Sequence, residues 1–399
     1  MERQNSRRAD GYARVLALLA VPGVAAAEID ARGRAAAQTP QADAKLVAAI
    51  DKLVANHGIH AEEPGVAIMV HQPGRVLFQK GYGLANVKTS QPITRHTLFE
   101  LASVSKSFTA TAVLILLDRG KLSLDDDIRK HLPELPVYAH SVHVRNLLQH
   151  TSGLPDYMAF EDVPASHGSY TVNADYLKVF ARDQRRFPLQ FPPGKKHSYN
   201  NTNFMLLASI VERVAKRPYA RFLRDEVFTP AGMPHSFLYD GPQAAPQAPR
   251  EYNRAVGYQW RPRKKTWEAD WGVPPDRRPT MLTVGDGSIW TNLEDMLKWD
   301  LAVRDEKLLK PATWKLALTP LKTRDGKRDH YGLGWSLYFD QPDKVFGYGH
   351  DGSWGGFETS YYRYLVADRT TVLLSNRGTF DVNKLWTALD KLIERHLAE

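Results

Sequence analysis

Residues 99–120 read FELASVSKSFTATAVLILLDRG and combine an extended start, a serine–lysine pair and a long apolar run. The apolar run ends at Gly120, a residue type that commonly closes a helix. The segment is therefore predicted to be a strand that passes into a helix at Ser103. Residues three apart on a helix share one face, and side chains lean toward the N-terminus. We therefore expect the Lys106 amine to reach the Ser103 hydroxyl.

This pair is a candidate nucleophile with its own base. A lysine amine is protonated in water at neutral pH and is then a poor base, but burial favours the neutral amine. A neutral amine can take the proton of a serine hydroxyl and activate its oxygen for attack. The Ser-x-x-Lys pattern alone arises about once by chance in a chain of this length. Its position at a strand-to-helix junction is what makes it informative.

A second segment, HSYNNTNF (197–204), places Tyr199 and Asn201 just before an amphipathic helix. A tyrosine hydroxyl beside a lysine can shuttle a proton, and an asparagine amide can hydrogen-bond a substrate carbonyl or amide. The structural alternative is that Tyr199 is a core ring with a satisfied hydroxyl and that Asn201 caps the helix.

A third segment, GYGHDGSWGGF (347–357), is a glycine-rich strand around His350 and Gly352. Its glycines let the backbone approach a ligand closely, and N–H groups beside Gly352 could face an oxyanion. His350 could donate to a substrate or to a tyrosine. The alternative is a glycine-rich edge strand with an exposed histidine.

Composition limits the remaining possibilities. The chain has 399 residues, 43% hydrophobic and 24% charged, a formal net charge of +9 and no cysteine. It is long enough for one large or two interleaved globular domains, and it has no disulfide, thiolate metal site or cysteine nucleophile. No H-E-x-x-H metal motif occurs, so we expect neither a metal nor a cofactor. The basic run RPRKK (261–265) carries no nucleic-acid recognition motif and is interpreted as a solvated loop; its neighbours Trp260, Trp267 and Trp271 are interpreted as core.

The N-terminus resembles an export signal. Residues 1–27 comprise a basic start, an apolar run at 15–24 and the small residues Ala25 and Ala27. This pattern predicts a cleaved signal peptide, a linker at 28–43, and an exported periplasmic or secreted protein without an integral membrane segment after cleavage. An apolar helix at the edge of the mature domain is the alternative.

The remaining patterns predict an α+β fold. Apolar runs around HQPG (71–74) indicate a hairpin, and β-rich runs return between 345 and 376 before a final amphipathic helix. We expect an antiparallel sheet built from N- and C-terminal segments and flanked by helices, with a mostly helical lobe inserted at about 121–285. Residues 230–280 are predicted to form long loops.

Taken together, the three segments resemble the serine β-lactamase and penicillin-binding-protein-like hydrolases, specifically the class C β-lactamase-related branch with its DD-peptidases, D-aminopeptidases and esterases. The motifs S-x-x-K (103–106), Y-x-N (199–201) and H-x-G (350–352) occur in the family's order. LLQHTSGLPDY (147–157), GDGSIWTNLEDMLKW (285–299) and YGLGW (331–335) are also similar to its stretches. The likeness covers about residues 44–397 and implies a β-lactamase/transpeptidase-like fold.

The resemblance also implies roles. Ser103 would form the acyl-enzyme, Lys106 would accept or relay its proton, and Tyr199 would exchange a proton with the leaving group and activate water. Asn201, His350 and Gly352 would contact the substrate, with His350 alternatively supporting the tyrosine. The oxyanion hole would comprise the N–H groups of Ser103 and Ser353. The expected partner is a small-molecule or peptide acyl substrate, with no nucleic acid.

Departures from the family pattern narrow the expected substrate. In the lactamase form the third motif carries Lys and Thr, which bind a substrate carboxylate, whereas this chain has His350 and Asp351. An Asp351 facing the cleft would repel a carboxylate; alternation along the strand instead places it opposite His350. Because the Lys–Thr anchor for a carboxylate is missing, we rank activity as an esterase, or as a D-amino-acid peptidase or carboxypeptidase, above β-lactamase activity. A non-catalytic binding or scaffold protein that kept the fold is the alternative from another class.

Overall fold

The computed structural model describes residues 43–138, 140–160, 163–166, 170–182, 187–241, 253–270, 280–323, 326, 329–341 and 344–398. The predicted signal peptide and nearly all of the predicted linker lie outside these residues. Among the described residues, helices with the length and apolar character needed to cross a membrane are absent.

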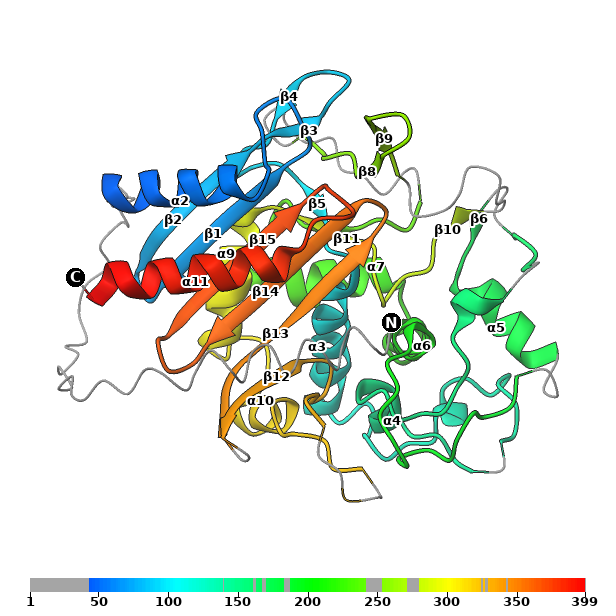
Figure 1. Ribbon diagram of the computed structural model, residues 1–399. Coiled ribbons are helices and arrows are strands. Elements are labelled where there is room, and N and C mark those ends of the chain that lie inside the picture. The colour runs from blue at the N-terminus through cyan, green and yellow to red at the C-terminus, as the bar shows by residue number, and fades with distance from the viewer. Residues whose placement is uncertain are drawn as a thin grey trace.

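A six-stranded antiparallel sheet forms the framework (Figure 1). Its order is β12 (Ser336–Gln341), β13 (Lys344–Trp354), β14 (Phe357–Tyr364), β15 (Arg369–Ser375), β1 (Val66–Gln72) and β2 (Arg75–Tyr82). The N-terminal hairpin therefore pairs with the C-terminal meander through β1 and β15. The prediction of one antiparallel sheet assembled from both ends of the chain is confirmed.

Two terminal helices cover one face of the sheet (Figure 1). They are α2 (Ala44–Asn56) and α11 (Val382–Ala398). Their apolar stripes, including Ile50 and Leu389, pack with Ile68 and Leu373 of the sheet in one buried cluster. This arrangement follows from their helical periodicity, because each helix has a single apolar face to bury.

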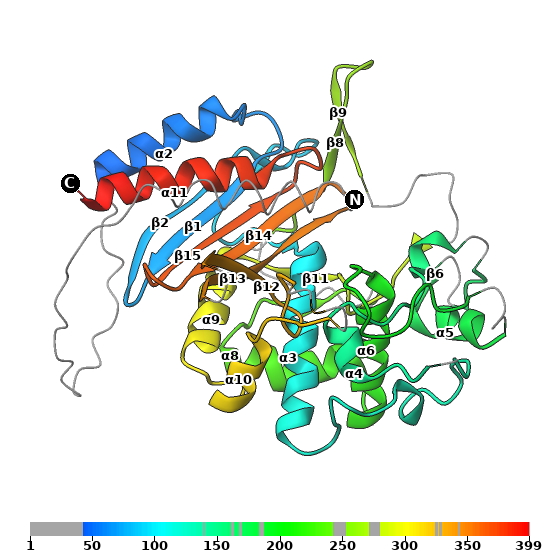
Figure 2. The same ribbon diagram turned by 60° about the horizontal axis from the view of Figure 1, so that its bottom comes forward.

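The helical lobe packs on the opposite face (Figure 2). Its helices are α3 (Ser105–Asp118), α4 (Val144–Leu148), α5 (Asn173–Arg182), α6 (Asn201–Ala215), α7 (Tyr219–Leu223), α8 (Thr229–Ala231), α9 (Leu293–Arg304) and α10 (Pro311–Ala317), with a π-helical turn at Arg224–Phe228. The lobe extends beyond the predicted 121–285 at both ends, because α3 precedes that range and because α9 and α10 also pack beneath the sheet before β12 begins.

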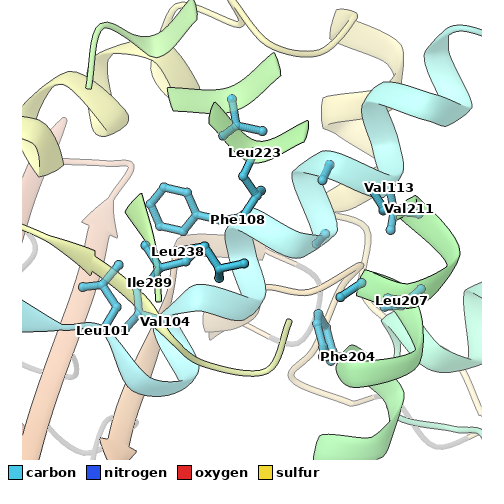
Figure 3. Close-up of a cluster of buried hydrophobic side chains, with 14 of the residues drawn as sticks. Leu101, Val104, Phe108, Val113, Phe204, Leu207, Val211, Leu223, Leu238 and Ile289 are labelled. Atoms are coloured by element: carbon cyan, nitrogen blue, oxygen red, sulfur yellow. The ribbon is translucent and has the colours of Figure 1, made fainter. Parts of the chain in front are cut away.

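Helix α3 runs through the centre of this lobe. Every residue from Ser105 to Leu116 is buried, so the helix has no polar face. Val113 of α3 lies beside Val211 of α6 in the main core, whereas Phe108 points to the other side of α3, toward Leu223 and Leu238 (Figure 3). The α3–α6 contact is what brings the first and second predicted motifs together.

Short elements complete the fold. They are β3 (Leu84–Asn86) with β4 (Gln91–Pro92), β5 (Phe99–Glu100) with β11 (Ile289–Thr291) and β7 (Phe237–Leu238), and β6 (Tyr170–Thr171) with β10 (Thr280–Met281). Three 3₁₀ turns occur in the described chain, at Ala102–Val104 (η2), Ile128–Lys130 (η3) and Tyr157–Ala159 (η4). The β5–β11 pair braces the segment that carries Ser103.

The prediction of long loops across 230–280 is wrong for residues 258–269. They form a hairpin of β8 (Tyr258–Arg261) and β9 (Thr266–Ala269) that projects from the body (Figure 2). The basic run 261–265 supplies its turn. The core interpretation is also wrong for Trp260, which is 36% exposed and lies 5.3 Å, ring to ring, from half-buried Trp267. The two rings pack on each other because the hairpin stands away from the core; Trp271 lies outside the described residues.

Candidate active site

Ser103 lies in the 3₁₀ turn η2 and is partly exposed, whereas α3 begins two residues later at Ser105. The helix therefore starts slightly later than predicted. Ala102, immediately before the serine, has a φ of 48°, a left-handed conformation that is uncommon for a residue with a side chain. The serine thus sits on a sharp bend between strand β5 and helix α3.

Strand β13 passes directly beside this bend. A Cβ atom on Gly352 would lie 2.3 Å from the Leu101 carbonyl oxygen and 2.9 Å from the Ser103 nitrogen. Only a glycine permits such an approach of two backbones. The third predicted motif therefore lies against the first, with exposed Ser353 next along the strand.

Lys106 is fully buried and its amine contacts three oxygens. Its Nζ lies 2.9 Å from Ser103 Oγ, 2.9 Å from Asn201 Oδ1 and 2.9 Å from the backbone oxygen of Asp286. The structure thus brings the lysine to the serine hydroxyl, and the start of α6 to the lysine.

A second contact fixes the orientation of the Asn201 amide. Asp156 Oδ2 accepts hydrogen bonds from Asn201 Nδ2 at 3.3 Å and from its backbone nitrogen at 3.1 Å. A carboxylate only accepts at neutral pH, so the amide nitrogen faces Asp156 and the amide oxygen faces Lys106.

The hydrogen bonds to Asn201 and Asp286 leave one remaining hydrogen-bonding position on the Lys106 amine for Ser103. The Asn201 oxygen and the Asp286 carbonyl are acceptors only, so Lys106 must donate to both. A neutral amine has two protons and one lone pair. With both protons committed, a neutral amine would have only its lone pair left for Ser103 Oγ at 2.9 Å, the geometry that a general base needs.

Tyr199 lies beside this pair. Its ring centre is 5.0 Å from Lys106 Nζ and 4.3 Å from the ring centre of His150. The side chain is half-buried, and its hydroxyl makes no hydrogen bond to any residue in the described part of the chain. The alternative of a core ring with a satisfied hydroxyl is therefore wrong.

The helix cap at the start of α6 is Asn200 rather than Asn201. The Asn200 side chain accepts a hydrogen bond from the Thr202 nitrogen at 2.8 Å, and Asn201 is the first helical residue. Because the preceding residue does the capping, the Asn201 side chain is free to point toward Lys106.

His350 is buried, with only 4% of its surface exposed, so the alternative of an exposed histidine is wrong. Its Nδ1 lies 2.6 Å from the Asp351 backbone oxygen, and its Nε2 lies 3.0 Å from the Tyr331 hydroxyl. Burial, and then the charge of Lys106, lowers the pKa of His350 to about 3. The ring is therefore neutral, with Nδ1 donating to the carbonyl and Nε2 accepting from the tyrosine.

Strand register settles which way Asp351 points. His350 pairs with Tyr361, and Tyr361 pairs with Val372. Tyr361 and Val372 belong to the core that also contains residues of α3. Asp351 pairs with Ser360 and, one strand further, Leu373, which belongs to the cluster beneath α2 and α11. Directly opposed residues share a sheet face. Asp351 is therefore on the face opposite the site.

Three acidic residues at the site were not singled out from the sequence. Asp156 orients Asn201, Glu100 accepts backbone hydrogen bonds beside Ser103, and Asp286 accepts one from the Tyr157 hydroxyl at 2.7 Å. Burial raises the pKa of Asp286, and the charge of Lys106 opposes that rise. The glycines on either side of Asp286 were the available signal, since they mark a tight loop.

Comparison with known proteins places this site in context. Residues 48–393 match the family model described as Beta-lactamase. The chain is 30% identical to penicillin-binding protein 4* of Bacillus subtilis (strain 168) over 316 residues, which are 78% of this chain and 67% of the relative. It is 30% identical to a D-aminopeptidase of Gluconobacter oxydans (strain 621H) over 341 residues, which are 83% of this chain and 58% of that relative.

The fold is similar to that of a solved structure as well. A penicillin-binding protein from Bacillus halodurans superposes with a TM-score of 0.71 at 26% identity, covering 86% of this chain and 98% of that one. The chain spans little more than half the length of the D-aminopeptidase, so the likeness to that relative concerns only part of it.

Proposed function

Because this chain belongs to the Beta-lactamase family, we propose that it is a serine hydrolase that cleaves an ester or amide through an acyl-enzyme on Ser103. The observation that carries the proposal is the 2.9 Å contact between Lys106 Nζ and Ser103 Oγ, with the other two polar contacts of the amine made to acceptors. A scaffold protein has no need of a buried lysine held in this way, since burying an amine is unfavourable.

Acylation begins when Lys106 takes the proton of the Ser103 hydroxyl. The freed Oγ attacks the acyl carbonyl, and the carbonyl oxygen becomes an oxyanion. The N–H groups of Ser103 and Ser353 would stabilise that charge, as the close approach of β13 to η2 favours. The Tyr199 hydroxyl would then move within hydrogen-bonding distance of Lys106 and relay the proton to the leaving oxygen or nitrogen, whose bond to the acyl carbon breaks.

Deacylation reverses the proton path. A water molecule gives a proton to Tyr199 as its oxygen attacks the ester carbon, and the hydroxyl proton of Tyr199 passes to the neutral Lys106 amine. Lys106 then returns a proton to the Ser103 oxygen as the ester bond breaks. Two observations support this role: the Tyr199 hydroxyl has no hydrogen-bond partner among the described residues, and the Lys106 amine lies 5.0 Å from the centre of the Tyr199 ring. His350 makes no hydrogen bond to Tyr199, and their ring centres are 6.2 Å apart. His350 would therefore contribute packing beside Tyr199.

Asn201 would have two tasks. Its amide oxygen holds Lys106, while its Nδ2 contacts Asp156 and, at 3.1 Å, the sulfur of Met158. A thioether is a weak acceptor, and Met158 is 37% exposed. A substrate carbonyl replacing that sulfur would gain the second amide proton.

The substrate is proposed to lack an obligatory carboxylate anchor at the third motif. His350 is neutral and both its nitrogens are occupied, so it offers neither a positive charge nor a free donor. Asp351 lies on the other sheet face and neither helps nor repels. This chemistry favours esters or D-aminoacyl amides over β-lactams, and the likeness to a D-aminopeptidase supports the amide option.

One screen tests the proposal. Purified protein is assayed against p-nitrophenyl esters, D-alanine p-nitroanilide, D-alanyl-D-alanine peptides and nitrocefin, with Ser103→Ala as blank. We expect turnover of an ester or D-aminoacyl amide, no turnover by the blank, and fluorophosphonate labelling at Ser103 only. More than a tenth of the wild-type rate in Ser103→Ala would remove the serine from the mechanism, and nitrocefin as the best substrate would reverse the substrate ranking.

We also propose that the protein is exported, on the basis of the basic, apolar and small-residue pattern in residues 1–27. Expression in a Gram-negative host followed by cell fractionation tests this. Full-length protein should lose its N-terminal segment and appear in the periplasm or medium, whereas a chain starting at residue 28 should stay in the cytoplasm. Equal distribution of both would contradict export.

A further inference from the structure

One oxygen of Glu100 joins two backbone bends that otherwise lie far apart in sequence. Glu100 Oε1 accepts a hydrogen bond from the Ala102 nitrogen at 3.1 Å and another from the Ser288 nitrogen at 2.8 Å. Both donors belong to residues with positive φ, 48° for Ala102 and 73° for Ser288. A residue with a side chain holds such a conformation only when its surroundings impose it.

The first bend presents the nucleophile, and the second belongs to the loop that contacts the base. Ala102 directly precedes Ser103, so its backbone angles set the direction of the serine. Ser288 closes the 285–288 loop, in which the Asp286 carbonyl accepts from Lys106. Glu100 is therefore bonded to both the segment that presents the nucleophile and the loop that holds its base.

The surroundings of Glu100 suit a residue that links these two segments. The residue pairs with Trp290 in the β5–β11 ladder and is 6% exposed. A Cβ on Gly287 would lie 3.5 Å from Glu100 Oε1, so the loop approaches the carboxyl closely. An apolar side chain would fill this buried place at lower cost, since burying a carboxylate is unfavourable. Retaining one there requires a task that its oxygen performs.

The titration of Glu100 is consistent with that setting. Burial raises its pKa to about 7, and the Asp286 carboxylate acts in the same direction. The two backbone N–H groups and the charge of Lys106 oppose the rise. The carboxyl is thus close enough to Asp286 and Lys106 for both charges to act on its pKa.

We propose that Glu100 is a positioning residue, which holds Ala102 and Ser288 in their left-handed conformations and so sets the distance between Ser103 and Lys106. The inference rests on the function proposed above for that pair. Glu100 makes no hydrogen bond to the serine hydroxyl or to the lysine amine, so its hydrogen bonds reach the pair through the backbone.

Two substitutions of matched size separate the acceptor oxygen from the space it fills. Glu100→Gln keeps an oxygen for both N–H groups, and Glu100→Met keeps the length but replaces the acceptor oxygen with a weakly accepting thioether. We expect the glutamine variant to retain at least about a third of wild-type kcat on an activated ester. The methionine variant should lose about 100-fold in kcat with KM changed less than about threefold, as expected for misplaced reacting groups. Glu100→Ala is the second loss variant, so the test does not depend on one substitution folding.

A rescue experiment isolates the bend. Glycine adopts a positive φ without strain, so adding Ala102→Gly to Glu100→Met should restore kcat by at least about tenfold. Amide hydrogen exchange of peptides spanning 99–105 and 285–290 provides a readout that does not depend on turnover. Exchange should be faster in Glu100→Met and unchanged in Glu100→Gln.

Several outcomes would overturn the inference. They are equal loss of kcat in Glu100→Gln and Glu100→Met, near wild-type kcat in a folded Glu100→Met or Glu100→Ala, or unchanged exchange of both peptides in the loss variants. A wild-type protein that turns over no substrate and takes no label at Ser103 would instead refute the proposed function. The exchange measurement would then still decide whether Glu100 holds the two bends.

Discussion

The Tyr331 hydroxyl donates to His350 Nε2 at 3.0 Å, while the opposite ring nitrogen donates to the Asp351 carbonyl at 2.6 Å. These two bonds commit both nitrogens of a buried imidazole to the protein itself. In the lactamase form of the family, the resemblance implies a lysine at the position of His350, and this cation would bind the substrate carboxylate. In this protein the same position holds an uncharged histidine whose nitrogens are both occupied. This loss of positive charge is the physical reason for expecting a different substrate.

Because His350 is buried, we expect the free energy of unfolding to fall at acidic pH. Its pKa is lowered from 6.5 to about 3, so the unfolded chain takes up a proton that the folded chain refuses. The contribution is fully present above pH 6.5 and is lost as the pH falls toward 3, at most about 1.4 kcal/mol per pH unit. Thermal unfolding between pH 7.5 and pH 4 measures it. His350→Asn should show a smaller fall in Tm over that range, and an equal fall would show that other groups govern the acid response.

Replacing Lys106 should stop acylation. Lys106→Met retains the length of a fully buried side chain but removes the amine. We expect acylation by an activated ester to slow by at least about 100-fold, or about 3 kcal/mol in the barrier. Stopped-flow burst kinetics measure the step. A normal burst in a folded variant would mean that another group deprotonates the serine.

Tyr199→Phe tests the proton relay separately from the nucleophile. The ring and its contacts with Lys106 and His150 remain, and only the free hydroxyl is lost. Turnover should fall by at least about tenfold, with fluorophosphonate labelling of Ser103 retained. An unchanged kcat would exclude the hydroxyl from the rate-limiting step. His150 packs against the same ring, so Tm is the control for altered packing.

Sequence patterns predicted those parts of the fold that are determined by residues close together in the chain. The Ser103–Lys106 contact follows from helical spacing, and strands β13 to β15 follow from runs of β-forming residues with turns between them. The two terminal helices follow from their apolar stripes. In each case the residues that determine the structure are neighbours in sequence.

The supporting shell of the site was not predictable in this way. Asp286 meets Lys106 across 180 positions, and Glu100 meets Ser288 across 188. Neither pair has a spacing that periodicity could reveal, because loops determine where these residues lie. The face occupied by Asp351 likewise depends on the register of three strands, so alternation could suggest its direction but only the pairing decides it.

The bonds from Asp156 to Asn201 predict a coupling between these two residues. Asp156→Ala removes the acceptor for both nitrogens of Asn201, so the amide can rotate and present its nitrogen to Lys106. We expect kcat to fall by about tenfold and stability by about 1–3 kcal/mol. In a double-mutant cycle with Asn201→Ala, the two losses of activity should be far from additive, because the Asp156 bond to Nδ2 acts on Lys106 through the Asn201 amide. Additive losses would show that Asp156 has a separate effect.

The last prediction concerns the contact of β13 with the serine turn. Gly352→Ala places a Cβ 2.3 Å from the Leu101 oxygen and 2.9 Å from the Ser103 nitrogen, both backbone atoms, so the strand must move away. Since the Ser103 and Ser353 N–H groups are proposed to bind the oxyanion together, kcat should fall by at least about 100-fold. Gly241→Ala is the control, because its added Cβ would meet nothing within 4 Å. Comparison of kcat and Tm for the two variants decides the matter: a Gly352→Ala protein that matches the control in both would mean that β13 does not need to touch the serine turn.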